Sequence, residues 1–229
     1  MILSIIIPTY NEEKTIVKIL EKIKNNSSDF FNYEVIVIDD ASTDQSRKLL
    51  ENNKHLYDKL LVNETNKGKG FSVKRGISSA SGTHIIFQDA DLEYNPGDFK
   101  KFEKIFIDFD ADGIIGSRFM YSNFTRSHNI LNKIGNTFLT LLFNLLYNTT
   151  FTDIYSCYFA FKKNLLNVQE LRTKGFEQHA EILCKIIKRG NKFYEVPISY
   201  NGRNVSEGKK IKPHHFFLVL YEIIRGRFI

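Results

Sequence analysis

The sequence contains no tryptophan and only two cysteines and four prolines among its 229 residues. Two cysteines, Cys157 and Cys184, cannot build a disulfide scaffold, and their spacing fits no metal-ligand motif. Reduced thiols in a cytosolic protein are the simpler interpretation. The N-terminal segment is apolar but lacks a basic region and a cleavage signature, so we do not expect a signal peptide.

Long hydrophobic runs are also missing. A membrane-spanning helix needs roughly 20 predominantly apolar residues. The best runs, 138–147 and 216–224, are much shorter and contain Asn144 and Glu222 respectively. Neither run is expected to cross a bilayer, although both could lie on its surface.

The overall composition is that of an ordinary globular protein, with 42% hydrophobic and 25% charged residues. This excludes a disordered chain, a collagen-like repeat and a coiled-coil rod. The formal net charge of +6 suits an anionic ligand or an anionic membrane surface. We expect no nucleic-acid partner.

The first half of the chain alternates apolar strand-like runs with helical patterns. Buried strands are predicted at 3–8, 34–38, 59–63 and 84–88, and helices at 15–24, 42–50 and 70–79. This order, with nearly continuous apolar strands, predicts an α/β fold with a mostly parallel sheet covered on both faces.

The second half is less regular. Helices are predicted at 98–109, 127–147 and 177–188, and strands at 112–117, 158–161 and 192–199. We expect one domain, residues 1–212, followed by an amphipathic C-terminal extension, residues 213–229.

Polar residues follow the predicted strands at the point where each one ends. The strand ends carry Pro8-Thr9-Tyr10-Asn11-Glu12, Asp39-Asp40 and Asp89-Ala90-Asp91. In open α/β sheets, ligands bind beyond the carboxyl ends of the strands. These residues are therefore expected to share one ligand-binding edge.

The pair Asp89 and Asp91 carries the strongest chemical signal. Two carboxylates just past a buried strand can hold Mg²⁺ or Mn²⁺, usually with a diphosphate completing the shell. A helix cap or a turn is the alternative for a lone Asp-x-Asp. The additional Asp39-Asp40 pair favours a site, although one of those two is expected to cap the helix at 42–50.

Several basic residues could bind an anion. The turn 66–70 matches no phosphate-loop motif, but it could offer amides and a lysine to an anion at a helix start. Arg118, Arg203 and Lys209 could clamp a pyrophosphate, or they could be solvated surface residues. No zinc pattern and no hydrolase signature are present.

Taken in order, these motifs resemble those of the family 2 glycosyltransferases, which have the GT-A fold. The motifs are Ile7-Pro8-Thr9-Tyr10-Asn11-Glu12, Asp39-Asp40, Asn66-Lys67-Gly68, Asp89-Ala90-Asp91-Leu92-Glu93 and Ser117-Arg118. Segments 152–157, 195–200 and 203–210 are similar to the dolichyl- or polyprenyl-phosphate mannosyl- and glucosyltransferase group. The resemblance covers nearly the whole chain.

The resemblance implies a nucleotide-diphosphate sugar donor, of the GDP-mannose or UDP-glucose type, and a divalent metal, Mg²⁺ or Mn²⁺. It implies that Asp89, Asp91 and Glu93 meet the metal; Glu93 stands where the mannosyltransferases usually carry Gln. The other implied substrate-binding residues are Pro8, Tyr10, Glu12, Asp39, Asp40, Lys67, Gly68, Arg118, Arg203 and Lys209.

The expected reaction inverts the anomeric carbon. A polyprenyl-phosphate acceptor is already anionic, whereas a sugar hydroxyl would need a general base, for which Asp153 is the candidate. A capping role for Asp153 is equally compatible with the sequence. Apolar helices at 127–147 and 213–229 beside basic residues favour the lipid acceptor and a peripheral position at the inner face of the membrane. Core packing or a homo-oligomer interface is the alternative for these helices.

Three other functions fit parts of the pattern. One is a transferase that extends a cell-envelope glycan, and another is a non-catalytic nucleotide-sugar-binding protein. A nucleotidyltransferase also uses paired aspartates, but it would need a glycine-rich loop near the N-terminus, and residues 8–13 contain no glycine.

Overall fold

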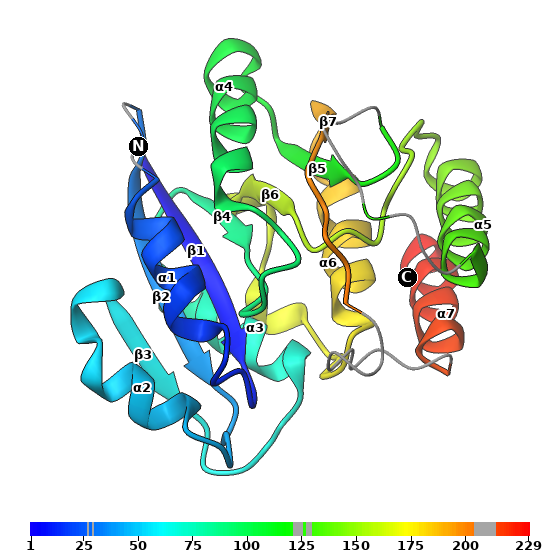
Figure 1. Cartoon of the computed structure of the whole chain (residues 1–229). Coiled ribbons are helices and arrows are strands. Elements are labelled where there is room, and N and C mark those ends of the chain that lie inside the picture. The colour runs from blue at the N-terminus through cyan, green and yellow to red at the C-terminus, as the bar shows by residue number, and fades with distance from the viewer. Residues whose placement is uncertain (27, 29, 121–125, 127–129, 204–213) are drawn as a thin grey trace.

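The computed structural model contains one seven-stranded sheet flanked by helices (Figure 1). It describes residues 1–26, 28, 30–120, 126, 130–203 and 214–229. The strands lie in the order β3-β2-β1-β4-β6-β5-β7. Their bounds are β1 Ile2–Thr9, β2 Asn32–Asp39, β3 Lys59–Val62, β4 His84–Phe87, β5 Gly113–Ser117, β6 Phe159–Lys162 and β7 Phe193–Pro197.

The helices are close to those expected from the apolar periodicity. Their bounds are α1 Ile16–Lys24, α2 Ser46–Asn52, α3 Lys69–Ser79, α4 Phe99–Phe109, α5 Ile130–Tyr147, α6 Gln178–Ile187 and α7 His215–Phe228. In α1, for example, Ile16, Ile19, Leu20 and Ile23 repeat at helical spacing and are all buried.

The predicted mostly parallel α/β sheet is confirmed, with one reversal. β1 pairs in parallel with β2 and β4, and β5 pairs in parallel with β7. β6 lies between β4 and β5 and is antiparallel to both. This short strand joins the two parallel parts of the sheet.

The sheet forms the centre of the core. In β1, residues Leu3 to Ile7 are completely buried, so both faces of the strand are covered. This explains the nearly continuous run of Ile and Leu, which is typical of a central parallel strand.

The helices α5 and α7 lie side by side at one end of the molecule (Figure 1). The Tyr147 hydroxyl donates a hydrogen bond to the carbonyl of Ile223, at 3.0 Å, and α7 also packs on α6. No helix in the described ranges is long and apolar enough to span a bilayer.

The predicted helix at 42–50 begins later than expected, at Ser46. Ala41 has a φ of 59°, in the left-handed region, and the backbone N–H of Ser42 donates to Asp39 Oδ1 at 3.3 Å. The chain therefore makes a turn directly after β2. That turn separates the directions of Asp39 and Asp40.

Candidate functional site

A cavity of about 560 Å³ opens at the carboxyl ends of β1, β2 and β4. This size lies within the usual range for ligand pockets. One part of the wall follows β1 and β2, the middle follows β4, and the far part comes from the start of α6. Residues of the wall include Pro8, Thr9, Tyr10, Glu12, Asp40, Gly68, Lys69, Asp89, Asp91, Glu93, Tyr94, Arg118, Tyr155, Cys157, Phe176, Gln178, His179, Tyr200 and Arg203.

Asp40 fixes the glycine-containing turn before α3. Its carboxylate accepts hydrogen bonds from the backbone N–H groups of Lys67, at 2.9 Å, and Gly68, at 2.8 Å, and from the Asn63 amide, at 2.6 Å. Gly68 has a φ of 94°, a conformation that disfavours any residue with a side chain. The backbone amides of Lys67 and Gly68, which were expected to be available to an anion, are thus hydrogen-bonded to Asp40.

Asp39 lies away from the cavity. It is fully buried, its Oδ1 accepts from the N–H of Ser42, and it is not part of the cavity wall. Neither Asp39 nor Asp40 caps α2, which begins at Ser46, so the expected helix cap is wrong; Asp39 instead holds the turn at Ser42. The position does not support direct contact with the nucleoside.

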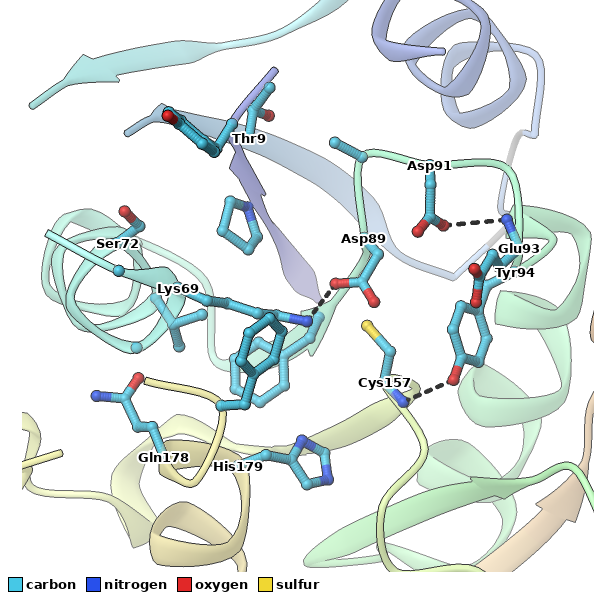
Figure 2. A pocket seen from close by; sticks show the side chains of 18 of the residues that line it. Thr9, Lys69, Ser72, Asp89, Asp91, Glu93, Tyr94, Cys157, Gln178 and His179 are labelled. Atoms are coloured by element: carbon cyan, nitrogen blue, oxygen red, sulfur yellow. Dashed lines mark hydrogen bonds and ion pairs between the residues drawn. The ribbon is translucent and has the colours of Figure 1, made fainter. Parts of the chain in front are cut away.

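Asp89 is paired with Lys69, a residue that the sequence did not single out. Lys69 Nζ lies 2.5 Å from Asp89 Oδ1 and 5.8 Å from the centre of the Phe176 ring (Figure 2). Burial alone would lower the pKa of Lys69, but the neighbouring Asp89 carboxylate outweighs burial and raises it. The ammonium group therefore stays charged inside the cavity.

Arg203 lies among three carboxylates on the other side of Asp89. Its guanidinium contacts Asp91 Oδ2 at 2.7 Å, Glu93 Oε1 at 3.2 Å and both carboxylate oxygens of Glu12 at 3.2 Å. Its backbone N–H also donates to Glu93 Oε1, at 2.9 Å. The Tyr200 hydroxyl donates to the second oxygen of Glu93, at 2.8 Å.

The acidic groups of the cavity outnumber these two cations. Glu12, Asp89, Asp91 and Glu93 formally carry four negative charges, against one positive charge each on Lys69 and Arg203. Burial, followed by repulsion from Asp89 and Glu93, raises the pKa of Asp91 to about 7. Asp91 is therefore only partly ionised at neutral pH, within a surplus of carboxylates.

The resemblance stated above implies a metal ion, and the donor set fits one in part. Across the described residues, no three His, Cys, Asp or Glu side chains form a group that could hold a metal. The implied trio of Asp89, Asp91 and Glu93 is therefore not assembled, because Asp89 faces Lys69 and Glu93 faces Arg203. Mg²⁺ is commonly held by one or two carboxylates plus substrate phosphates, and the excess charge at Asp91 suits that kind of site.

Arg118 reaches the cavity from the end of β5, and Asp153 lies behind it. Asp153 Oδ2 accepts from Arg118 Nε at 2.7 Å, and Oδ1 accepts from Arg118 Nη2 at 2.9 Å. The Asn136 amide on α5 also donates to Oδ1, at 2.7 Å. Burial would raise the pKa of Asp153, but the charge and hydrogen bonds of Arg118 lower it.

These contacts correct the general-base assignment of Asp153. The side chain is fully buried, does not line the cavity and uses both oxygens to hold Arg118 and Asn136. A base must reach the proton that it removes. Asp153 is placed to orient Arg118 instead.

The structure brings most of the predicted site residues together. Pro8, Tyr10, Glu12, Asp40, Gly68, Asp89, Asp91, Glu93, Arg118 and Arg203 all line the cavity. Lys67 is exposed and does not belong to the wall, and Lys209 lies outside the described residues. Lys69, two residues beyond Lys67, lines the cavity but was not among the predicted site residues.

Other residues of the wall were not among the predicted site residues, although Cys157 ends a segment that carried the resemblance. The Tyr94 hydroxyl accepts a hydrogen bond from the N–H of Cys157, at 3.1 Å, and the Cys157 side chain lies beside Asp89 (Figure 2). Burial, together with the Asp89 carboxylate, raises the pKa of the Cys157 thiol well above its usual range. The thiol is therefore protonated and acts as a small neutral group of the wall.

Proteins of known function resemble the chain over nearly its whole length. The dolichol-phosphate mannosyltransferase of Pyrococcus furiosus is 30% identical over 98% of this chain and 63% of its own length. The UDP-N-acetylglucosamine–dolichyl-phosphate N-acetylglucosaminyltransferase of Methanococcus voltae is 30% identical over 90% of this chain and 92% of its own length. The chain thus spans less than two thirds of the Pyrococcus protein.

Solved structures share the fold. Glucosyl-3-phosphoglycerate synthase of Mycobacterium tuberculosis, in complex with Mn²⁺, UDP and glucosyl-3-phosphoglycerate, aligns with a TM-score of 0.74 and 18% identity, over 99% of this chain and 80% of that one. Staphylococcus aureus TarS, in complex with UDP-GlcNAc, aligns with a TM-score of 0.68 and 19% identity, over 99% and 66%. The expected GT-A fold is confirmed.

The sequence model of glycosyl transferase family 2 matches residues 4–168, which include β1 to β6 and most of the cavity wall. The motifs between Ile7 and Arg118 that resemble those of family 2 therefore all lie within the matched residues. The chain belongs to glycosyl transferase family 2.

Proposed function

We propose that the protein transfers a hexose from a nucleoside-diphosphate sugar to a polyprenyl phosphate, with inversion at the anomeric carbon. The observation that supports this most is the cavity itself. It joins a groove at the ends of β1 and β2 to an acidic centre at Asp91 and to the buried cation Arg118. The relatives named for dolichyl-phosphate acceptors support the choice of acceptor.

The donor would bind with its nucleoside against Pro8, Thr9 and Tyr10 and its diphosphate near Asp91. Hydrogen bonds to Asp40 already fix the backbone of the turn at Gly68, so this turn needs little further ordering when the donor binds. Lys69 lies where its ammonium group can donate to an oxygen of the diphosphate or of the sugar. The base and the sugar are of the GDP-mannose or UDP-glucose type.

A divalent metal, Mg²⁺ or Mn²⁺, would be held by Asp91 with Asp89 beside it, and when bound it supplies positive charge for the leaving diphosphate. The protein adds Lys69 and Arg203 to the same region. Cations fixed where negative charge develops stabilise the transition state more than the ground state.

The acceptor phosphate would be positioned by Arg118. The bidentate contact with Asp153 fixes the plane of its guanidinium, and the Tyr200 ring lies 5.2 Å from Arg118 Cζ. A phosphate oxygen needs no deprotonation to attack, which agrees with the absence of an accessible base at Asp153. The attacking oxygen would approach the anomeric carbon on the side opposite to the diphosphate.

The apolar faces of α5 and α7 support a peripheral contact with the membrane that carries such an acceptor. Ile134 and Leu145 on α5 are 57% and 74% exposed, and Phe217 and Phe228 on α7 are 68% and 77% exposed. Contiguous apolar surface of this kind marks an interaction site. Lys133, Arg225 and Arg227 add positive charge, which suits the anionic inner face of a membrane.

Transfer can be measured with radiolabelled donors. GDP- and UDP-sugars would be incubated with Mn²⁺ and either detergent-dispersed polyprenyl phosphate or a soluble sugar acceptor. We expect label in the lipid fraction with one donor. Label only in the soluble glycan would replace the lipid acceptor, and donor binding without any transfer would indicate a non-catalytic binding protein.

The membrane contact has a separate test. The double substitution Leu131→Asp and Leu145→Asp should abolish co-sedimentation with phosphatidylglycerol vesicles. Ile107→Asp, at an exposed apolar residue of α4, is the matched control and should leave co-sedimentation unchanged. If the wild-type protein forms a dimer and does not bind vesicles, and the double substitution on α5 disrupts that dimer, the apolar face contacts a second copy of the chain instead.

A further inference from the structure

Glu93 and Arg203 are already hydrogen-bonded to each other through backbone and side-chain groups. Arg203 donates to Glu93 Oε1 through both its backbone N–H, at 2.9 Å, and its Nε, at 3.2 Å. The other Glu93 oxygen accepts from the Tyr200 hydroxyl, and the N–H of Asn201 donates to the Glu93 carbonyl, at 2.9 Å. Segment 200–203 is thus joined to Glu93 by backbone and side-chain contacts.

The terminal nitrogens of the Arg203 guanidinium extend from Glu93 to Asp91 and Glu12. Nη2 lies 2.7 Å from Asp91 Oδ2, while Glu12 receives Nη1 and Nη2 at 3.2 Å. The other oxygen, Asp91 Oδ1, accepts from the backbone N–H of Glu93 at 3.0 Å (Figure 2). Each Asp91 oxygen therefore already has a hydrogen-bond donor, and one of those donors carries a positive charge.

A guanidinium and a divalent ion cannot share one carboxylate oxygen without strong repulsion. We propose that Arg203, anchored by Glu93, is a resident cation that competes with the divalent metal for Asp91 and suppresses metal binding in the absence of donor. This inference rests on the proposed function. It assigns Glu93 to holding Arg203, in place of the metal-ligand role implied by the resemblance.

Donor binding would relieve the competition. The donor diphosphate offers oxygens of the same kind as the carboxylates, so Arg203 can exchange Asp91 for phosphate while its anchor at Glu93 stays in place. Metal and donor would then bind with positive coupling, and each would raise the affinity of the other by the same factor. Lys69, which is paired with Asp89, stays outside this exchange.

Mn²⁺ binding to the full chain, followed by electron paramagnetic resonance, tests the competition without any turnover. In the absence of nucleotide, Arg203→Gln should tighten Mn²⁺ binding roughly tenfold. Arg203→Lys keeps the charge but cannot reach three carboxylates. Its Mn²⁺ affinity should lie between those of the wild-type protein and Arg203→Gln. Arg47→Gln removes an exposed charge that is paired with Glu51 and does not line the cavity, and it should change nothing.

A double-mutant cycle separates the two roles of Glu93. If Glu93 acts through Arg203, then Glu93→Gln in the Arg203→Gln background should change Mn²⁺ affinity by less than about threefold. A metal ligand would lose at least about tenfold in either background. That loss, or unchanged or weaker Mn²⁺ binding by Arg203→Gln, would overturn the proposal.

Nucleotide binding distinguishes this failure from failure of the proposed function. UDP and GDP would each be titrated with and without Mn²⁺. We expect one of them to tighten Mn²⁺ binding by the wild-type protein, and this coupling should be about tenfold smaller in Arg203→Gln. A protein that binds neither nucleotide would contradict the proposed function, whereas nucleotide binding with equal coupling in both proteins would contradict only the competition.

Discussion

Both carboxylate oxygens of Asp153 accept hydrogen bonds from the Arg118 guanidinium, and Arg118, unlike Asp153, lines the cavity. The backbone N–H of Arg118 also donates to Asp153 Oδ2, at 3.0 Å. The pair is nearly inaccessible to solvent, with side chains 16% and 0% exposed. A buried cation held in this way is fixed in direction before any anion reaches it.

Asp153→Asn should therefore damage both stability and transfer. Leaving Arg118 without its counter-ion should lower the free energy of unfolding by ~3 kcal/mol, measured by urea denaturation. Asp108→Asn, which breaks the exposed pair with Lys104, is the control and should cost under ~1 kcal/mol. A stable Asp153→Asn protein that loses only the acidic limb of its pH–rate profile would restore the general-base role.

Lys69→Gln and Lys67→Gln form a matched pair. Lys69 is paired with Asp89 in the cavity, whereas the side chain of Lys67 is exposed and outside the cavity wall. Loss of Lys69 should weaken nucleotide-sugar binding by at least roughly tenfold and lower stability by ~1–3 kcal/mol. Thermal shift with and without donor measures both effects, and equal behaviour of the two variants would contradict the role given to Lys69.

Asp91→Asn should separate activity from stability. Transfer should fall by at least about a hundredfold, because the acidic centre is lost. Stability at pH 8 should stay level or rise by ~1 kcal/mol, because repulsion by Asp89 and Glu93 penalises the charged Asp91. A marked loss of melting temperature at pH 8 would show that Asp91 supports the fold.

The same carboxyl group predicts a pH dependence. Burial and repulsion from Asp89 and Glu93 raise the pKa of Asp91 to about 7 in the folded protein, against an ordinary value of 3.8. The unfolded chain therefore releases this proton first, and the contribution of Asp91 to stability falls as pH rises from about 3.8 to about 7. The stability of the wild-type protein relative to Asp91→Asn should fall across this window in denaturation curves at stepped pH.

Glu34 predicts the opposite slope at lower pH. Burial would raise its pKa, but hydrogen bonds from Lys59, Ser4 and Ser81 lower it to about 2. Its contribution to stability, ~2 kcal/mol, is present above the ordinary glutamate pKa of 4.5 and is lost as pH falls toward 2. Glu34→Gln should be less stable than wild type at pH 6 and nearly equal near pH 2, and exposed Glu51→Gln should match wild type throughout. A constant difference between Glu34→Gln and wild type would exclude this linkage.

The sequence predicted the fold well because apolar periodicity and strand ends are local features. The runs at 3–8 and 34–38 became β1 and β2, and the acidic motifs after β2 and β4 reached the same edge of the sheet. The reversal of β6 could not be predicted in this way. A short apolar run such as 158–161 carries no information about its direction in a sheet.

Individual side-chain roles were harder to predict than their neighbourhood. Lys67 and Lys69 have the same chemistry and lie in the same turn, and only the start of α3 decides which one enters the cavity. Asp153 looked equally suited to catalysis and to capping. Its burial behind Arg118 depends on packing between segments that are 35 residues apart.

Gly70 joins the part of the cavity wall at the start of α3 to the part that precedes α6. Its backbone N–H donates to the carbonyl of Lys174 at 2.8 Å, and an added Cβ would lie only 2.7 Å from the carbonyl carbon of Lys174 and 2.8 Å from the carbonyl oxygen of Gly175. Even a methyl group there would push the main chain before α6 outward, and Phe176 with it. One missing side chain thus keeps the two parts of the wall in contact, so the shape of either part is sensitive to changes in the other.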